Sequence, residues 1–135
     1  MATILAHITV RPGMAAEFEG VARTLYAATH ELEPRVRRYE YWRGADENTY
    51  YSLLSFDTFN DFIGHQASDH HESASPQLGK MIAGLRLEWV DPIGGASPLT
   101  PTNGGTPGES ASDLERLYSK RFAAQVAEWW ESLRN

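Results

Sequence analysis

The chain has 135 residues without cysteine, and its 18 acidic residues outnumber the 12 Lys and Arg, which gives a formal charge of −6. This length favours one domain, and the lack of cysteine excludes disulfides and thiolate metal sites. The acidic balance argues against a nucleic-acid partner, because phosphate binding needs a clustered basic surface. No apolar run approaches the roughly 18–20 residues of a membrane span, so we expect a cytoplasmic protein without a membrane partner.

The chain opens with a predicted strand and a predicted helix. Apolar and mixed side chains alternate over residues 3–11, with His7 on the mixed face. A period of two residues is typical of a strand, and Pro12 ends it. Over residues 14–32 the apolar residues recur at three and four, which predicts an amphipathic helix that stops before Pro34.

An aromatic hairpin follows. Residues 35–43 and 49–56 alternate as strands, and residues 44–48 form a polar turn between them. Asp57 or Thr58 can cap the next helical segment by accepting a hydrogen bond from a free backbone N–H.

Ser75-Pro76 indicates a fresh helical start, and residues 85–90 alternate again as a fourth strand. The order predicts an α+β fold: a ferredoxin-like β-α-β-β-α-β domain over residues 1–92, with both helices on one face of a four-stranded antiparallel sheet. The other face would expose Leu5, His7 and aromatic side chains. Because such a patch usually marks an interface, we expect a homodimer with the two sheets packed face to face.

The C-terminal third differs in composition. Residues 93–110 are rich in Pro and Gly and predict an extended or flexible linker. Residues 111–135 predict a final amphipathic helix, which begins with a Ser-x-x-Glu capping box at Ser112. Trp129 and Trp130 give this helix a large apolar surface, so we expect both to be substantially buried on the domain or on the partner subunit.

Three stretches carry a family resemblance. They are Ile8-Thr9-Val10-Arg11-Pro12-Gly13, Tyr39-Glu40-Tyr41-Trp42-Arg43 and Phe62-Ile63-Gly64-His65-Gln66-Ala67-Ser68-Asp69-His70. With them, the chain from residue 4 to residue 92 resembles the antibiotic biosynthesis monooxygenase (ABM) domain of the dimeric α+β barrel superfamily. The resemblance implies a homodimer in which each subunit encloses a pocket. It also implies oxidation of phenolic or quinol substrates with O₂ and without a bound metal or flavin.

Some positions depart from relatives of this family. The third strand often ends in a Glu-x-Trp-like element, where this chain has Ser55-Phe56-Asp57. The haem-degrading branch carries an Asn in the first strand, a Trp near the second helix and a later His ligand. Those positions correspond to His7, His65 and Ser75, so the resemblance does not extend to haem cleavage.

Two histidines are the candidate catalytic residues. His7 is expected to face the interior pocket of the dimeric barrel, where a neutral imidazole could remove a proton from a phenol. The alternative is a buried histidine satisfied by a neighbouring hydroxyl or carbonyl. His65 matches a histidine common in the family, and it either reaches the pocket or caps a helix.

His70 and His71 lie close to His65 in the sequence and invite a metal interpretation. Their spacing is not the i, i+4 pair plus carboxylate of a zinc helix, so we predict no metal and no cofactor.

The strands are unusually aromatic, and some of these rings are expected to line a pocket for a flat hydrophobic molecule. The candidate substrate-binding residues are Tyr39, Trp42, Tyr51, Phe56 and Trp89. The leading hypothesis is a cofactor-independent monooxygenase that oxidises an aromatic phenol or quinol with O₂. The alternatives are a non-catalytic dimeric barrel protein that binds a small hydrophobic ligand or has a stress-related role, and an isomerase or lyase.

Overall fold

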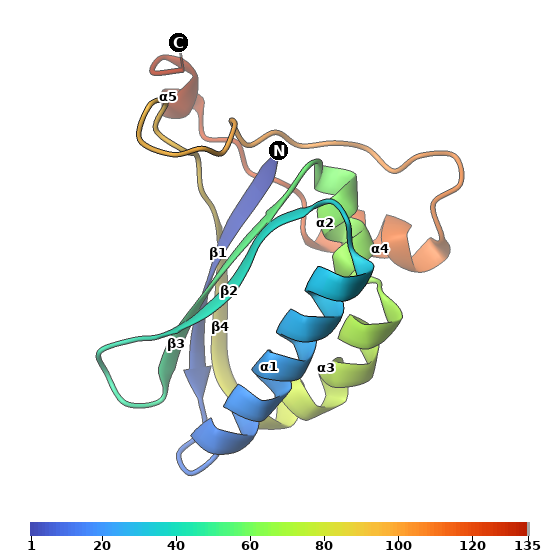
Figure 1. Cartoon of the computed structure of the whole chain (residues 1–135). Helices are drawn as coiled ribbons and strands as arrows, with labels where there is room; N and C mark the ends of the chain where they lie inside the picture. Colours follow the sequence, from blue (N-terminus) through green and yellow to red (C-terminus); the bar gives the residue numbers. More distant parts are fainter. Residues whose placement is uncertain (135) are drawn as a thin grey trace.

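The computed structural model describes residues 1–134 and contains one four-stranded antiparallel sheet, ordered β2-β3-β1-β4, with the longer helices on one face (Figure 1). This confirms the predicted α+β, ferredoxin-like fold. Among the described residues, no helix has both the length and the apolar character that a bilayer crossing requires. The cytoplasmic location stays a prediction. The elements are β1 (Ala2–Val10), α1 (Ala15–Leu32), β2 (Val36–Arg43), β3 (Thr49–Phe56), α2 (Phe59–Gln66), α3 (Asp69–Met81), β4 (Ile82–Trp89), α4 (Asp113–Arg121) and α5 (Glu128–Glu131).

Side-chain caps place the helices between β3 and β4. Thr58 caps α2 by accepting a hydrogen bond from the backbone N–H of Asp61. Ser68 then caps α3 through the backbone N–H of His71. Because this cap starts α3 well before Ser75, the predicted helical start at Ser75-Pro76 is wrong, and Pro76 lies inside α3.

The two faces of the sheet have different surroundings. The face under the helices carries the core, including the fully buried Ile4 of β1 against Phe18 and Leu25 of α1. The other face is open in the single chain. Across it, Trp42, Tyr51, His7 and Arg86 occupy successive paired positions on β2, β3, β1 and β4.

The C-terminal residues do not form the single helix expected over residues 111–135. After α4, Phe122 packs edge-on against Phe62 of α2 at 6.1 Å between ring centroids, and the Ala123 carbonyl accepts a hydrogen bond from Trp89 Nε1 at 3.2 Å. These contacts hold the chain in a non-helical path before the short α5.

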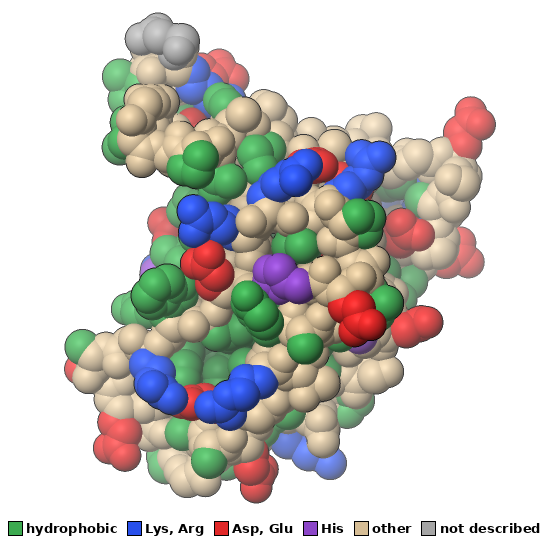
Figure 2. Space-filling model, in the orientation of Figure 1, with side chains coloured by type: hydrophobic (Ala, Val, Ile, Leu, Met, Phe, Trp, Pro, Cys, Tyr) green, Lys and Arg blue, Asp and Glu red, His purple; other side chains and the backbone are tan. Residues whose placement is uncertain are grey.

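The helix α5 stands beyond the end of the sheet at the upper left of Figure 1, and Figure 2 shows hydrophobic side chains on this projecting part. Trp129 on α5 is 66% exposed, so its predicted burial is wrong for the single chain. Trp130 is half-buried, and the Arg134 guanidinium lies over its ring.

Residues 93–110 are extended but anchored. Thr102 is fully buried, and its hydroxyl donates to the Val90 carbonyl. The Asp91 carboxylate accepts a hydrogen bond from the backbone N–H of Thr102 and two more from the Arg134 guanidinium, at 2.6 and 3.0 Å. A single carboxylate therefore ties the linker and the C-terminal end to β4.

We expect Asp91→Ala to release this C-terminal segment. Because losing a charge-assisted hydrogen bond costs about 1.5–3 kcal/mol, trypsin should cleave after Lys120 and Arg121 about tenfold faster or more. Limited proteolysis followed by mass spectrometry measures the rate. Glu109→Ala, which removes an exposed carboxylate from the same segment, is the control; equal rates for the two variants would contradict the anchoring role.

Candidate active site

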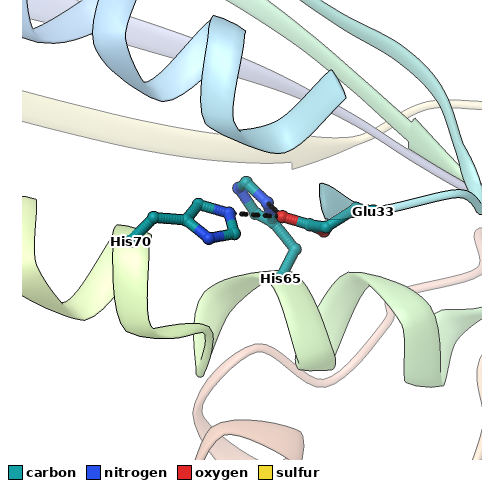
Figure 3. A group of neighbouring side chains, drawn as sticks. All are labelled: Glu33, His65 and His70. Carbon is teal, nitrogen blue, oxygen red and sulfur yellow. Dashed lines mark hydrogen bonds and ion pairs between the residues drawn. The ribbon is translucent and has the colours of Figure 1, made fainter. Parts of the chain in front are cut away.

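Three helix ends meet at a cluster of ionisable side chains (Figure 3). Glu33 is the C-cap of α1, His65 lies in the last turn of α2, and His70 lies in the first turn of α3. His65 Nδ1 and His70 Nε2 lie 2.9 and 2.6 Å from the same oxygen, Glu33 Oε2. One carboxylate therefore holds the three helices together at this point.

His65 is the structural member of the cluster. It is only 1% exposed, and its ring packs against those of Tyr39 and Phe56, at 4.9 and 5.1 Å between centroids. Nδ1 donates to Glu33, and the buried Nε2 has no hydrogen-bond partner within residues 1–134. His65 lines neither the groove between α1 and α3 nor the groove between α1 and β2, and its contact with Glu33 positions that carboxylate.

His70 is the more exposed of the two histidines, with 15% of its side chain accessible against 0% for His65. Its Nε2 donates to Glu33, while its other ring nitrogen points away from that carboxylate (Figure 3) and has no partner within the described part of the chain. His70 also lines a groove of about 700 Å³ between α1 and α3. The apolar lining residues of this groove are Met14, Val21, Leu25, Ala28, Ala74 and Met81.

The charge of Glu33 follows from its partners. Burial alone would raise the pKa of this carboxyl, but hydrogen bonds and charge attraction from His65 and His70 outweigh burial and leave the pKa below its usual value. Glu33 is therefore an anion at neutral pH. An anionic acceptor beside Nε2 holds a proton on that nitrogen, so in the neutral form of His70 the free lone pair lies on Nδ1.

His71 completes the surroundings. Burial, followed by repulsion from His65 and His70, lowers the pKa of His71 to about 4. Its buried Nδ1 has no hydrogen-bond partner within residues 1–134. His71 is therefore neutral at physiological pH and contributes no charge to the cluster.

The cluster also contains the donor set of a metal site. The nearest ligand atoms of Glu33, His65 and His70 all lie within 4.8 Å of one another, and two imidazoles with one carboxylate suit several transition metals. In this structure the two hydrogen bonds to Glu33 Oε2 already occupy that oxygen, His65 Nδ1 and His70 Nε2. The sequence prediction of no metal site considered only the spacing of the histidines, and it did not include Glu33.

His7, the other predicted catalytic residue, lies on the open face of the sheet. Its Nε2 is 2.9 Å from Glu88 Oε2 and 3.0 Å from Arg86 Nη2. The hydrogen bond from His7 is the main reason that the pKa of Glu88 is lowered. His7 lines neither the groove between α1 and α3 nor the groove between α1 and β2.

The five predicted substrate-binding residues do not form one site. Tyr39 and Phe56 are buried against His65, and Trp89 is covered by Phe59, Phe62 and the segment after α4. Trp42 and Tyr51 are paired on the opposite, open face, where they are 60% and 41% exposed.

Sequence reasoning missed the pairing of Glu33 with His70. The sequence pattern brings His70 into view only through a metal interpretation with His65 and His71, and it does not single out Glu33. No sequence spacing signals this pair, because the two residues lie on different helices and meet only in the folded chain.

The fold and the cluster define a ferredoxin-like α+β protein with a histidine–carboxylate pair beside a groove. The model of the family described as "Antibiotic biosynthesis monooxygenase" (ABM) matches residues 1–77, more than half of the chain. The chain belongs to this family, which confirms the resemblance. The family match ends before β4, so the C-terminal segment lies outside it.

Solved structures of other proteins are similar to this fold. A Caulobacter crescentus protein described as a candidate antibiotic biosynthesis monooxygenase is 28% identical, with a TM-score of 0.65, over 68% of this chain and 89% of that one. Rv0793 from Mycobacterium tuberculosis is 18% identical, with a TM-score of 0.64, over 71% and 98%. PA3566 from Pseudomonas aeruginosa is 21% identical, with a TM-score of 0.61, over 66% and 90%. The last two support the fold alone. No curated protein matches the chain.

Proposed function

We propose that the chain is a cofactor-independent monooxygenase that oxidises an aromatic phenol or quinol with O₂ in the groove between α1 and α3. One observation carries this assignment: the Glu33–His70 pair lies beside the apolar groove that His70 lines. A neutral imidazole whose tautomer is fixed by a carboxylate is suited to accept the proton of a phenolic hydroxyl. We assign this role to His70 instead of His7 or His65, because only His70 lines the groove.

The groove suits a flat hydrophobic substrate. Its volume of about 700 Å³ falls within the range of about 300–1,000 Å³ that is usual for small-molecule sites. Its walls are mainly apolar. Ser73, which lies one helical turn after His70 on α3, can hydrogen-bond a second oxygen of the substrate.

The substrate supplies the electrons in the proposed reaction. Transfer of the phenolic proton to His70 Nδ1 leaves a phenolate, whose electron-rich ring reduces O₂ and forms a carbon–oxygen bond. The resulting peroxide breaks at its O–O bond. As the O–O bond breaks, the same carbon loses its hydrogen as a proton and one oxygen stays on it as the quinone carbonyl. The other oxygen takes up this proton and the one held by His70 and leaves as water, so no external reductant is required. The Glu33 carboxylate stabilises the His70 imidazolium formed in the first step.

Oxygen uptake tests this function. Anthrones and naphthols should each consume one O₂ per quinone formed, with purified protein and without added metal or flavin. Quenching of Trp fluorescence without O₂ uptake would instead identify the non-catalytic ligand-binding protein. A product formed under anaerobic conditions would identify isomerase or lyase chemistry.

The open sheet face supports a homodimer. Leu5 and Leu53 are paired at its centre. The outer strands carry one Arg–Glu pair each, Arg38–Glu40 on β2 and Arg86–Glu88 on β4. A twofold axis would bring these pairs to complementary positions over an apolar centre, as isologous interfaces require.

We expect Leu53→Lys to convert the dimer to a monomer, because a lysine at the centre of the apolar patch would be buried without a partner. Analytical ultracentrifugation measures the mass. Leu117→Lys, at an exposed leucine on α4, is the matched control and should leave the mass unchanged. A dimer that survives Leu53→Lys would exclude the sheet face as the interface.

A further inference from the structure

A second groove lies on the other side of α1, between this helix and β2, with a volume of about 580 Å³. Figure 2 shows it at the lower left as a hydrophobic hollow bordered by basic side chains with an acidic one between them. It shares no lining residue with the groove beside His70. Its aromatic lining residues are Phe18, Tyr26, Tyr41, Trp42 and Tyr50.

The aromatic floor of this second groove is well packed. Phe18 and Tyr50 are buried, with ring centroids 4.8 Å apart, and Tyr41 meets Phe18 edge-on at 6.0 Å. The Tyr41 hydroxyl is fixed by a hydrogen bond with Tyr39 at 2.8 Å. Tyr26, which lines the groove from α1 on the helix side of the sheet, is 47% exposed, and its ring is available to a ligand. Such walls favour a planar aromatic molecule.

The rim of the groove holds one acidic side chain between two basic ones. Glu19 accepts hydrogen bonds from Arg43 at 2.7 and 2.9 Å, from the Tyr50 hydroxyl at 2.7 Å and from Arg23 at 3.3 Å. These bonds, first that from Arg43 and then that from Tyr50, lower the pKa of Glu19 to about 2. Each Glu19 oxygen already accepts two bonds, so a cationic ligand would find little acceptor capacity there.

The charged lining residues of the groove balance in number, but Arg23 keeps most of its hydrogen-bond donors free. Glu40, the other lining carboxylate, accepts from Arg38 at 3.0 Å and from Trp42 Nε1 at 3.2 Å. The lining itself holds the guanidinium groups of Arg23 and Arg43 against the carboxylates of Glu19 and Glu40, and Arg38, outside the lining, pairs with Glu40. Arg23 holds Glu19 by one long bond and its side chain is 71% exposed, so most of its donors are free.

From this we infer that the α1–β2 groove is a second ligand site, which binds a planar aromatic monoanion of the aryl carboxylate class. The ring packs on the floor formed by Phe18, Tyr41 and Tyr50, and the carboxylate binds the Arg23 guanidinium. Guanidinium and carboxylate match as two parallel hydrogen bonds. The site goes beyond the proposed oxidation, because it contains no histidine and lies apart from the Glu33–His70 pair.

Naphthoate and the uncharged naphthylmethanol are suitable probes, and isothermal titration calorimetry measures both. The wild-type protein should bind naphthoate about tenfold tighter or more, because a charge-assisted hydrogen bond contributes about 1.5–3 kcal/mol. Arg23→Gln should remove this preference and leave naphthylmethanol binding unchanged. Tyr26→Ala should weaken binding of both probes.

Lys80→Gln is the matched control, because Lys80 is the basic residue of the other groove and should not affect naphthoate binding here. Three results would overturn the inference: equal affinities for the two probes, no naphthoate binding at all, or a loss of affinity in Lys80→Gln but not in Arg23→Gln. Circular dichroism of each variant confirms that the fold is retained.

Discussion

Replacing His70 by glutamine should lower kcat/KM for a phenolic substrate by about 100- to 10,000-fold, the usual contribution of a general base. Glutamine can still donate a hydrogen bond to Glu33, so the helix ends should stay together, but it cannot accept the phenolic proton. The loss should therefore fall on kcat, with little change in KM. It should also shrink as the pH rises toward the pKa of the phenol, where the substrate ionises without help.

His7→Gln is the matched control, because it makes the same change on the open face of the sheet. It should leave kcat/KM within about twofold of wild type, as expected for a residue outside the groove. Glu33→Gln should lower kcat, since it removes the negative charge that stabilises the protonated imidazole. A large loss in His7→Gln together with full activity in His70→Gln would return the base role to His7.

The free energy of unfolding should fall as the pH drops from about 7 to about 5, and His71 should be a main cause. The pKa of His71 is about 4 in the folded chain, against an ordinary value of 6.5. Below about pH 6.5 the unfolded chain therefore takes up a proton that the folded chain refuses. The loss should reach about 2 kcal/mol by about pH 5 and about 3 kcal/mol below about pH 4.

Urea denaturation of wild type and His71→Leu at several pH values measures this contribution. Leucine cannot titrate and replaces a side chain whose buried Nδ1 has no partner within the described residues. The variant should lose about 2 kcal/mol less than wild type between about pH 7 and about pH 5. Glu33, whose pKa lies below its usual value, stays ionised throughout this window. Parallel stability curves would mean that His71 is solvated when folded.

The fold was predictable because its signals are local. Alternation over residues 3–11 placed His7 opposite Ile4, and the structure has the same arrangement. The end of the C-terminal helix was not predictable from local signals, because the apolar periodicity continues past Arg121. The helix ends where Phe122 packs on Phe62 and the Ala123 carbonyl accepts a hydrogen bond from Trp89, and both partners are distant in the sequence.

The candidate site was predictable only in part. His65 and His70 lie in the segment that resembles the family. Which of the two lines a groove depends on how α2 and α3 pack against α1. The register of β2 decides which of its aromatic side chains face the helices and which face the open side of the sheet. An irregularity between Val36 and Arg38 sets this register. Tyr39 is consequently buried and Trp42 exposed. Long-range pairing of this kind has no counterpart in the sequence spacing.

A crystal structure of the protein soaked anaerobically with a dihydroxyanthrone tests the central claim most directly. The absence of O₂ stops the reaction before the ring is oxidised. We expect the three-ring system between α1 and α3, with a phenolic oxygen within about 3.2 Å of His70 Nδ1, the reach of a hydrogen bond. Density for the ring on the open sheet face beside His7, or only in the α1–β2 groove, would contradict the assignment of the active site.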